Sequence, residues 1–147
     1  MTLTQFRHWA LWQASRAFIA AHVRPTFGLT CDMECDPLPE PPYIMLSNHG
    51  TFFDPWLVGG WSRNPLSIMM NDDAYRSGIV SRTYLRWIGT YGKKKGSSDY
   101  RAMKKTLSLL GAGKGVLIFP EGQTTWDGET QPIYAGIEKI VLRAKCP

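Results

Sequence analysis

Residues 43–56, "YIMLSNHGTFFDPW", combine a short apolar run, a turn with a histidine, and a helix start. The first five residues have the pattern of a strand buried on both faces. Asp54-Pro55 predicts a helix with Asp54 as its N-cap, because proline favours the first helical positions and Asp is a common cap. A strand that passes through a turn into a helix predicts the first unit of an α/β domain.

Two further apolar runs, residues 66–70 and 115–119, have the same strand character. Helical patterns separate the runs, at residues 55–62, 73–87 and 98–110, and the last of these has Ser97 or Ser98 as its expected N-cap. Strands that alternate with helices predict a single α/β domain with a central, mostly parallel or mixed sheet flanked by helices.

The N-terminal part of the chain is different. Residues 4–23 have apolar side chains at helical spacing and predict an amphipathic helix, and the proline-rich residues 27–42 predict an irregular lead-in. We therefore divide the chain into a lead segment, 1–42, and a domain, 43–147. The helix contains two tryptophans beside arginines, which suits a membrane interface, but packing on its own domain explains the pattern equally well.

The amino-acid composition limits the classes of function that the chain can have. The 147 residues are 44% hydrophobic, enough for one domain with a core, and the net charge of +5 favours anionic partners such as phospholipid, nucleic acid or phosphorylated substrates. Three cysteines are too few for a disulfide scaffold, so we expect a reducing, cytoplasmic location. No stretch reaches the roughly 20 apolar residues of a membrane span.

His49 and Asp54 form the first candidate site. A turn after the first strand can fold the imidazole back onto the carboxylate that opens the next helix. The carboxylate then fixes the tautomer, stabilises the imidazolium, and leaves the second ring nitrogen as a proton acceptor. A loop histidine beside a helix cap, or a pair of metal ligands, would give the same spacing.

The second candidate site follows the predicted strand 115–119. Glu121 and Gly122 come at its carboxyl end, the edge of an α/β sheet where ligands bind. The carboxylate can hydrogen-bond a polyol or a neighbouring loop, and Gly122 permits close approach of the backbone. An ordinary turn after a strand is the alternative.

Together these two stretches resemble the glycerolipid acyltransferases, the family of lysophosphatidate and glycerol-phosphate acyltransferases. The family's first motif, His, four residues, Asp, matches His49 and Asp54, and its Phe-Pro-Glu-Gly motif matches residues 119–122. Residues 89–105 look like its second block, in which a glycine precedes a short strand. Residues 132–147 resemble its Gly-Ile helix. The resemblance covers residues 43–147 and implies a glycerol-3-phosphate acyltransferase-like fold.

The resemblance implies a reaction in phospholipid biosynthesis. His49, oriented by Asp54, would deprotonate a hydroxyl of a lysophospholipid or polyol-phosphate acceptor, which attacks the thioester of an acyl-CoA or acyl-carrier protein. That thioester is a co-substrate, and neither a cofactor nor a metal is expected. Acyl substrates also imply peripheral contact with a membrane. The substrate-binding residues expected from the matched motifs are Lys95, Glu121, Gly122 and Thr124.

The chain departs from the family at three places. Its second block has residues 93–95, all lysine, where the family has an arginine; Lys95 is the best match by its offset from Gly89. After the Phe-Pro-Glu-Gly motif the family often continues with Thr-Arg-Ser, whereas this chain has Gln-Thr-Thr at residues 123–125. The sequence stops where the family would begin another apolar strand, so we expect a piece of a longer domain.

Three other interpretations compete. Lysines 93–95 with the basic residues of the following helix could bind nucleic acid, with tyrosines for stacking. His49 and Asp54 could support metal-dependent hydrolysis, although no further histidine cluster is present, and Cys31 with Cys35 supplies only two thiols. The chain could also be an inactive fragment of an acyltransferase. We expect no nucleic-acid partner.

Overall fold

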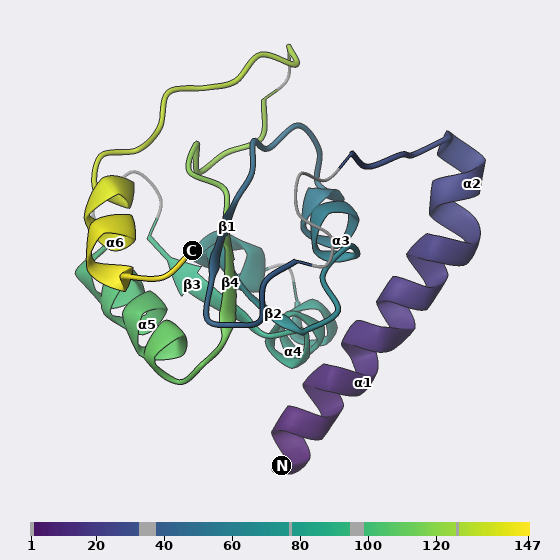
Figure 1. Cartoon of the computed structure of the whole chain (residues 1–147), viewed down its shortest axis with the longest axis horizontal. Helices are drawn as coiled ribbons and strands as arrows, with labels where there is room; N and C mark the ends of the chain where they lie inside the picture. The colour runs from purple at the N-terminus through teal and green to yellow at the C-terminus, as the bar shows by residue number, and fades with distance from the viewer. Residues whose placement is uncertain (1, 33–37, 77, 95–98, 126) are drawn as a thin grey trace.

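The computed structural model describes residues 2–32, 38–76, 78–94, 99–125 and 127–147. Figure 1 shows the elements around a central sheet. In chain order they are α1 (Leu3–Phe18), a π-helix (Ile19–Val23), α2 (Arg24–Phe27), β1 (Ile44–Leu46), α3 (Asp54–Gly59), β2 (Leu66–Asn71), a 3-10 helix (Asp72–Arg76), α4 (Ile79–Trp87), β3 (Thr90–Lys93), α5 (Tyr100–Gly111), β4 (Gly115–Ile118) and α6 (Ile137–Ala144).

The sheet has four strands in the order β1-β4-β2-β3, and every neighbouring pair is parallel. This confirms the predicted single α/β domain. Because all four strands run the same way, their carboxyl ends meet at one edge, where the loops after β1 and β4 rise together at the top of Figure 1. That edge is where α/β folds of this kind bind ligands.

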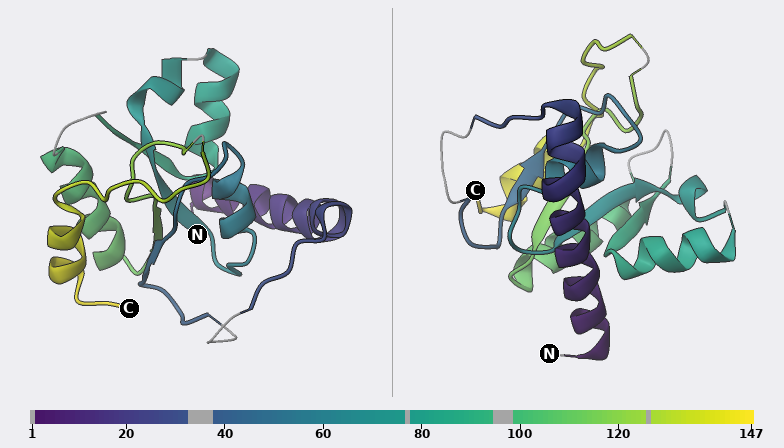
Figure 2. Two further views of the ribbon diagram at one scale, coloured as in Figure 1. Left: turned by 90° about the horizontal axis from the view of Figure 1, so that it is seen from above. Right: turned by 90° about the vertical axis from the view of Figure 1, so that its right-hand side faces the viewer.

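Helices cover both faces of the sheet. Figure 2 shows the N-terminal helix along one side of the domain and α5 with α6 on the opposite side. Residues of β4 alternate between two cores: Leu117 packs with Trp12 and Leu66, whereas Val116 and Ile118 pack with side chains of α5 and α6. A strand buried on both faces explains why its sequence is an unbroken apolar run.

The N-terminal helix is longer than predicted and is joined to the domain. Its helical backbone continues through the π-helix to Phe27. Trp12 is buried, and its indole donates a hydrogen bond to the carbonyl of Ser62. Arg16 and Arg24 both donate to the carbonyl of Gly60. The helix therefore packs on its own domain with one tryptophan and two arginines. No helix in the described ranges is both long and apolar enough to cross a membrane.

Several local predictions need correction. Asp54 is not the N-cap of α3: Phe53 holds that position, and Asp54 is the first helical residue. The cap of α5 is Asp99, whose carboxylate accepts from two backbone N–H groups, and not Ser97 or Ser98, which lie outside the described residues. The helix predicted over 73–87 is two pieces, since Gly78 at φ 131° separates α4 from the 3-10 helix. The apolar pattern did not reveal β3, which only the resemblance suggested.

Candidate active site

The two predicted corners lie side by side at the carboxyl edge of the sheet. The backbone N–H of Thr125, after β4, donates a 2.8 Å hydrogen bond to the carbonyl of His49, after β1. Between them opens a cleft of about 300 Å³ that β2 and β3 also border. Residues of all four strand ends or of the loops that follow them therefore share one site. Its walls include His49, Phe52, Asn71, Lys93, Lys94, Phe119, Gly122, Thr124 and Tyr134.

The imidazole and the carboxylate are in direct contact. Nδ1 of His49 lies 3.0 Å from Oδ2 of Asp54, with both side chains more than four-fifths buried. Thr51 holds the carboxylate from within the turn: its backbone N–H donates to Oδ2 at 2.7 Å and its hydroxyl to Oδ1 at 2.8 Å. These three donors explain why the Asp54 side chain folds back into the turn instead of capping α3. We call His49 and Asp54 the dyad.

The same contacts set the charge of Asp54. Burial alone would raise the pKa of this carboxyl, but hydrogen bonds from the Thr51 backbone, from His49 and from the Thr51 hydroxyl outweigh burial and lower it below its ordinary value. Asp54 is therefore an anion at neutral pH. An anion at Nδ1 keeps the proton on that nitrogen and leaves Nε2 as the proton acceptor.

The ring of His49 is fixed from a second direction. It stacks on the ring of Phe119 with 4.2 Å between the centroids and 24° between the planes. Phe119 comes from the Phe-Pro-Glu-Gly motif and is itself buried against Trp12, Tyr43 and Ile68. An imidazole held by a carboxylate at one edge and an aromatic ring on one face has little freedom to turn. The imidazole that lines the cleft is therefore held in one orientation.

The residues predicted to bind substrate are only partly brought together. Thr124 and Gly122 line the cleft, and Gly122 has φ 68°, which a side chain would strain. Glu121 is 2% exposed and does not line the cleft, yet neither carboxylate oxygen has a hydrogen-bond partner within the described ranges. A buried carboxylate in that condition calls for a donor. Lys95 lies outside the described residues.

Two further residues line the cleft: Lys93, which the sequence analysis named within the lysine run without choosing it as the substrate-binding residue, and Tyr134, which it missed. Lys93, half-buried at the end of β3, places its ammonium 4.5 Å from the centre of the Tyr134 ring. Burial lowers the pKa of Lys93, partly offset by the charge of Asp99. Tyr134 donates its backbone N–H to the carbonyl of Pro120 and packs so close to Gly122 that a Cβ there would lie 2.7 Å from its ring. The lysine run signalled Lys93, but no pattern pointed to Tyr134.

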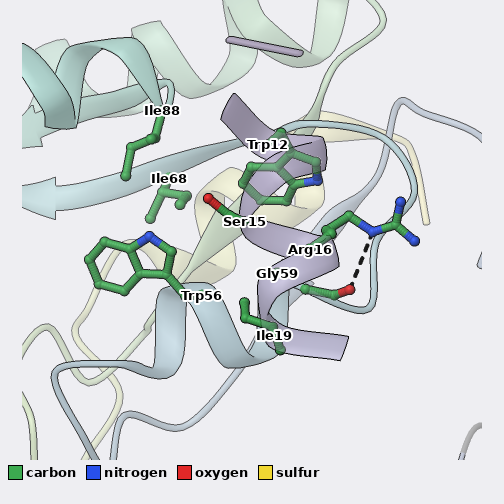
Figure 3. Close-up of a pocket in the computed structure, with 9 residues that line it drawn as sticks. Trp12, Ser15, Arg16, Ile19, Trp56, Gly59, Ile68 and Ile88 are labelled. Carbon is green, nitrogen blue, oxygen red and sulfur yellow. Dashed lines mark hydrogen bonds between the residues drawn. The ribbon is translucent and has the colours of Figure 1, made fainter. Parts of the chain in front are cut away.

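A much larger apolar groove of about 1130 Å³ adjoins this cleft. It runs between the N-terminal helices and α3 with α4. Phe52 lines both the groove and the cleft, so the two spaces meet at the turn that holds the dyad. Figure 3 shows a neighbouring small pocket that shares Ser15, Ile19 and Trp56 with the groove; there Trp56 from α3 lies near Ile68 and Ile88. We call the larger space of about 1130 Å³ the apolar groove.

The described residues contain no group of three or more His, Cys, Asp or Glu side chains that could hold a metal ion. Within these residues, no third His, Cys, Asp or Glu side chain joins His49 and Asp54 to form a metal site. Cys35, half of the thiol pair noted in the sequence, lies outside the described ranges. The chemistry that these residues support is proton transfer at an imidazole nitrogen.

The comparison with protein families identifies the family of the chain. Residues 31–147, most of the chain, match the family model described as Acyltransferase. The chain belongs to the acyltransferase family. This membership confirms the resemblance drawn from the motifs, and the parallel α/β fold is consistent with it. No curated protein and no solved structure matches the acyltransferase chain.

Proposed function

We propose that this chain transfers a fatty acyl group from the thioester of an acyl-CoA or acyl-carrier protein to a hydroxyl of a lysophospholipid or related acceptor, as a step in phospholipid biosynthesis. The observation that carries the proposal is the 3.0 Å contact of the dyad at a cleft on the carboxyl edge of the sheet, in a chain of the acyltransferase family. His49 acts as the general base and Asp54 orients it.

The proposed step is direct. Nε2 of His49 removes the proton of the acceptor hydroxyl as its oxygen attacks the thioester carbonyl carbon. The tetrahedral intermediate then collapses, the carbon–sulfur bond breaks, and the leaving thiolate takes the proton from the imidazolium. Asp54 stabilises that imidazolium while it exists. Ser47, the hydroxyl nearest the dyad in sequence on the β1 side, donates to the carbonyl of Asn48, which supports transfer without an acyl-enzyme.

The apolar groove supports a long acyl chain as the transferred group. Ligand pockets commonly measure about 300–1,000 Å³ and are lined mainly by apolar side chains. The groove reaches that size, and it joins the cleft at Phe52, one residue from Thr51 of the dyad turn. A chain in the groove would place its thioester carbonyl near His49.

The polar wall of the cleft supports an anionic acceptor head group. Lys93 lines the cleft, and its ammonium lies over the Tyr134 ring and can pair with a phosphate as a point charge. Glu121 is buried beside Gly122 and does not line the cleft, so its carboxylate oxygens are placed to accept from the loops that carry the site. The lysines at β3 therefore belong to the cleft, which favours a small phosphorylated group over nucleic acid.

The test is acyl transfer by the full chain with a labelled acyl-CoA and a panel of lysophospholipid and polyol-phosphate acceptors. His49→Ala should lower transfer by about a hundredfold or more, because a positioned base is lost. His22→Ala is the matched control, since His22 is an exposed histidine on the N-terminal helices. Appreciable transfer by a folded His49→Ala variant would refute the proposal, and so would equal loss in both variants.

A further inference from the structure

Six of the most exposed large apolar side chains surround the mouth of the apolar groove. They come from the N-terminal helices, the dyad turn and the start of α4, and each is between 60% and 85% exposed. Five of them also line the groove, and the sixth is adjacent to one that does. We call this set the groove rim: Phe18, Phe27, Phe52, Phe53, Ile79 and Val80.

Single exposed apolar residues are ordinary, but a contiguous set marks an interaction site. The rim residues come from three separate parts of the chain, and no single sequence pattern shared by these parts explains why their side chains are exposed. Phe52 and Phe53 contact each other with 5.7 Å between their centroids, and Phe52 also contacts Trp56 on the groove wall. The apolar surface is therefore continuous from the rim into the groove.

Two of the elements that carry the rim have positive side chains and no negative ones. The N-terminal helices, residues 3–27, contain three arginines and no acidic residue. The helix α4 contains Arg82 and Arg86 and also no acidic residue. Arg16 and Arg24 are held by the carbonyl of Gly60, so Arg7, Arg82 and Arg86 are the exposed positive side chains of these two elements. Such a surface complements an anionic one, and arginines beside exposed aromatic and aliphatic side chains suit the interface of a membrane.

Resting on the proposed function, we infer that the groove rim lies on the surface of a bilayer that contains anionic phospholipid. A symmetric contact with a second copy of the chain would bring two sets of arginines together, which disfavours that occupant. The orientation also connects the groove with the source of its ligand, because an acyl chain in the bilayer would enter the groove without crossing water.

This surface differs from the one that the sequence suggested. One of the two interpretations of the first helix was a membrane contact through its tryptophans and arginines. Trp12 is buried against α3 and Arg16 binds the carbonyl of Gly60, whereas Trp9 is 47% exposed. The face with Trp12 and Arg16 holds the helix to the domain. The membrane-binding side chains are instead those at the groove mouth, and the start of α4, far along the chain, becomes part of the contact.

The test measures binding of the full chain to sedimented vesicles of phosphatidylcholine with phosphatidylglycerol and of phosphatidylcholine alone. Ile79→Asp should weaken binding to the mixed vesicles at least about tenfold, because it places a charge in the apolar contact. Leu142→Asp is the matched control: Leu142 is 77% exposed, as Ile79 is 75%, but it lies on α6 at the other face of the sheet. Vesicle binding by the Leu142→Asp variant should equal that of the wild type.

Three results would overturn the inference: no binding to mixed vesicles, equal loss in both variants, or a dimer in solution that Ile79→Asp dissociates. A second assay separates this inference from the proposed function. With a water-soluble short-chain thioester and acceptor, Ile79→Asp should keep normal transfer, because Ile79 does not line the groove or the cleft. His49→Ala should lose transfer and still bind vesicles. Failure of one arm leaves the other arm interpretable.

Discussion

Replacement of Asp54 by Asn tests how the dyad works, because the structure lets asparagine keep most of the geometry. Oδ2 now accepts from both His49 Nδ1 and the Thr51 N–H, so an asparagine must place its amide oxygen there. Its NH2 group then takes the place of Oδ1 and faces the Thr51 hydroxyl oxygen, which can accept. The imidazole keeps its tautomer and its orientation. What is lost is the negative charge beside the imidazolium.

The size of that loss follows from the geometry. Two unit charges roughly 4 Å apart interact by about 4 kcal/mol at an effective dielectric constant near 20. The side chains of His49 and Asp54 are 18% and 15% exposed, so water screens part of the interaction. Taking about half gives ~2 kcal/mol, which corresponds to a rate decrease of about 30-fold. Asp54→Ala removes the orienting oxygen too, and should cost about a thousandfold.

The assay is the initial rate of thiol release from an acyl-CoA in the presence of acceptor, with kcat and KM measured separately and the melting temperature as the folding control. The loss should appear in kcat with little change in KM, since the charge acts on the protonated intermediate. Wild-type kcat in Asp54→Asn would show that the carboxylate has no role in the reaction. Equal losses in the Asn and Ala variants would refute the reasoning that charge and orientation contribute separately.

Three shorter predictions follow from other contacts. Thr51→Val removes the hydroxyl that donates to the dyad carboxylate and should lower kcat about tenfold, whereas Thr51→Ser should restore it. Lys93→Met should raise KM for phosphorylated acceptors with little effect on kcat. Lys104→Met, on the exposed side of α5, should change neither KM nor kcat. Burial and then the charge of Lys114 lower the pKa of His8, so the unfolded chain binds more protons, and melting temperature should fall as pH drops through the ordinary value of 6.5; His8→Gln should remove this dependence.

The relation between the two motifs could be predicted because it depends on topology alone. Apolar runs without alternation predicted strands buried on both faces, and helices between them predicted parallel connections. Once the strands are parallel, the residues that follow β1 and β4 must emerge at one edge. The hydrogen bond from Thr125 to His49 and the stacking on Phe119 are the consequence. No side-chain detail was needed to expect that the corners meet.

Side-chain competition explains what the sequence could not show. Asp before Pro usually caps a helix. Here the Asp54 carboxylate instead accepts hydrogen bonds from Thr51 and His49, and these keep it in the turn. The position of the first helix depends on Gly59 of α3, which leaves room for the ring of Trp12. A Cβ at residue 59 would lie 2.8 Å from that ring. The apolar groove exists only between helices distant in sequence, so no local pattern could reveal it.

One turn produces both the reactive and the apolar halves of the site. The four residues between His49 and Asp54 are enough for the chain to reverse, and two hydrogen bonds from Thr51 hold the carboxylate inside the loop. The next two residues are then left on the outside, where Phe52 borders the cleft and the groove and Phe53 borders the groove. The spacing that aligns the base therefore also places aromatic rings where a lipid chain would approach. A change in the length of this turn should disrupt proton transfer and chain binding together.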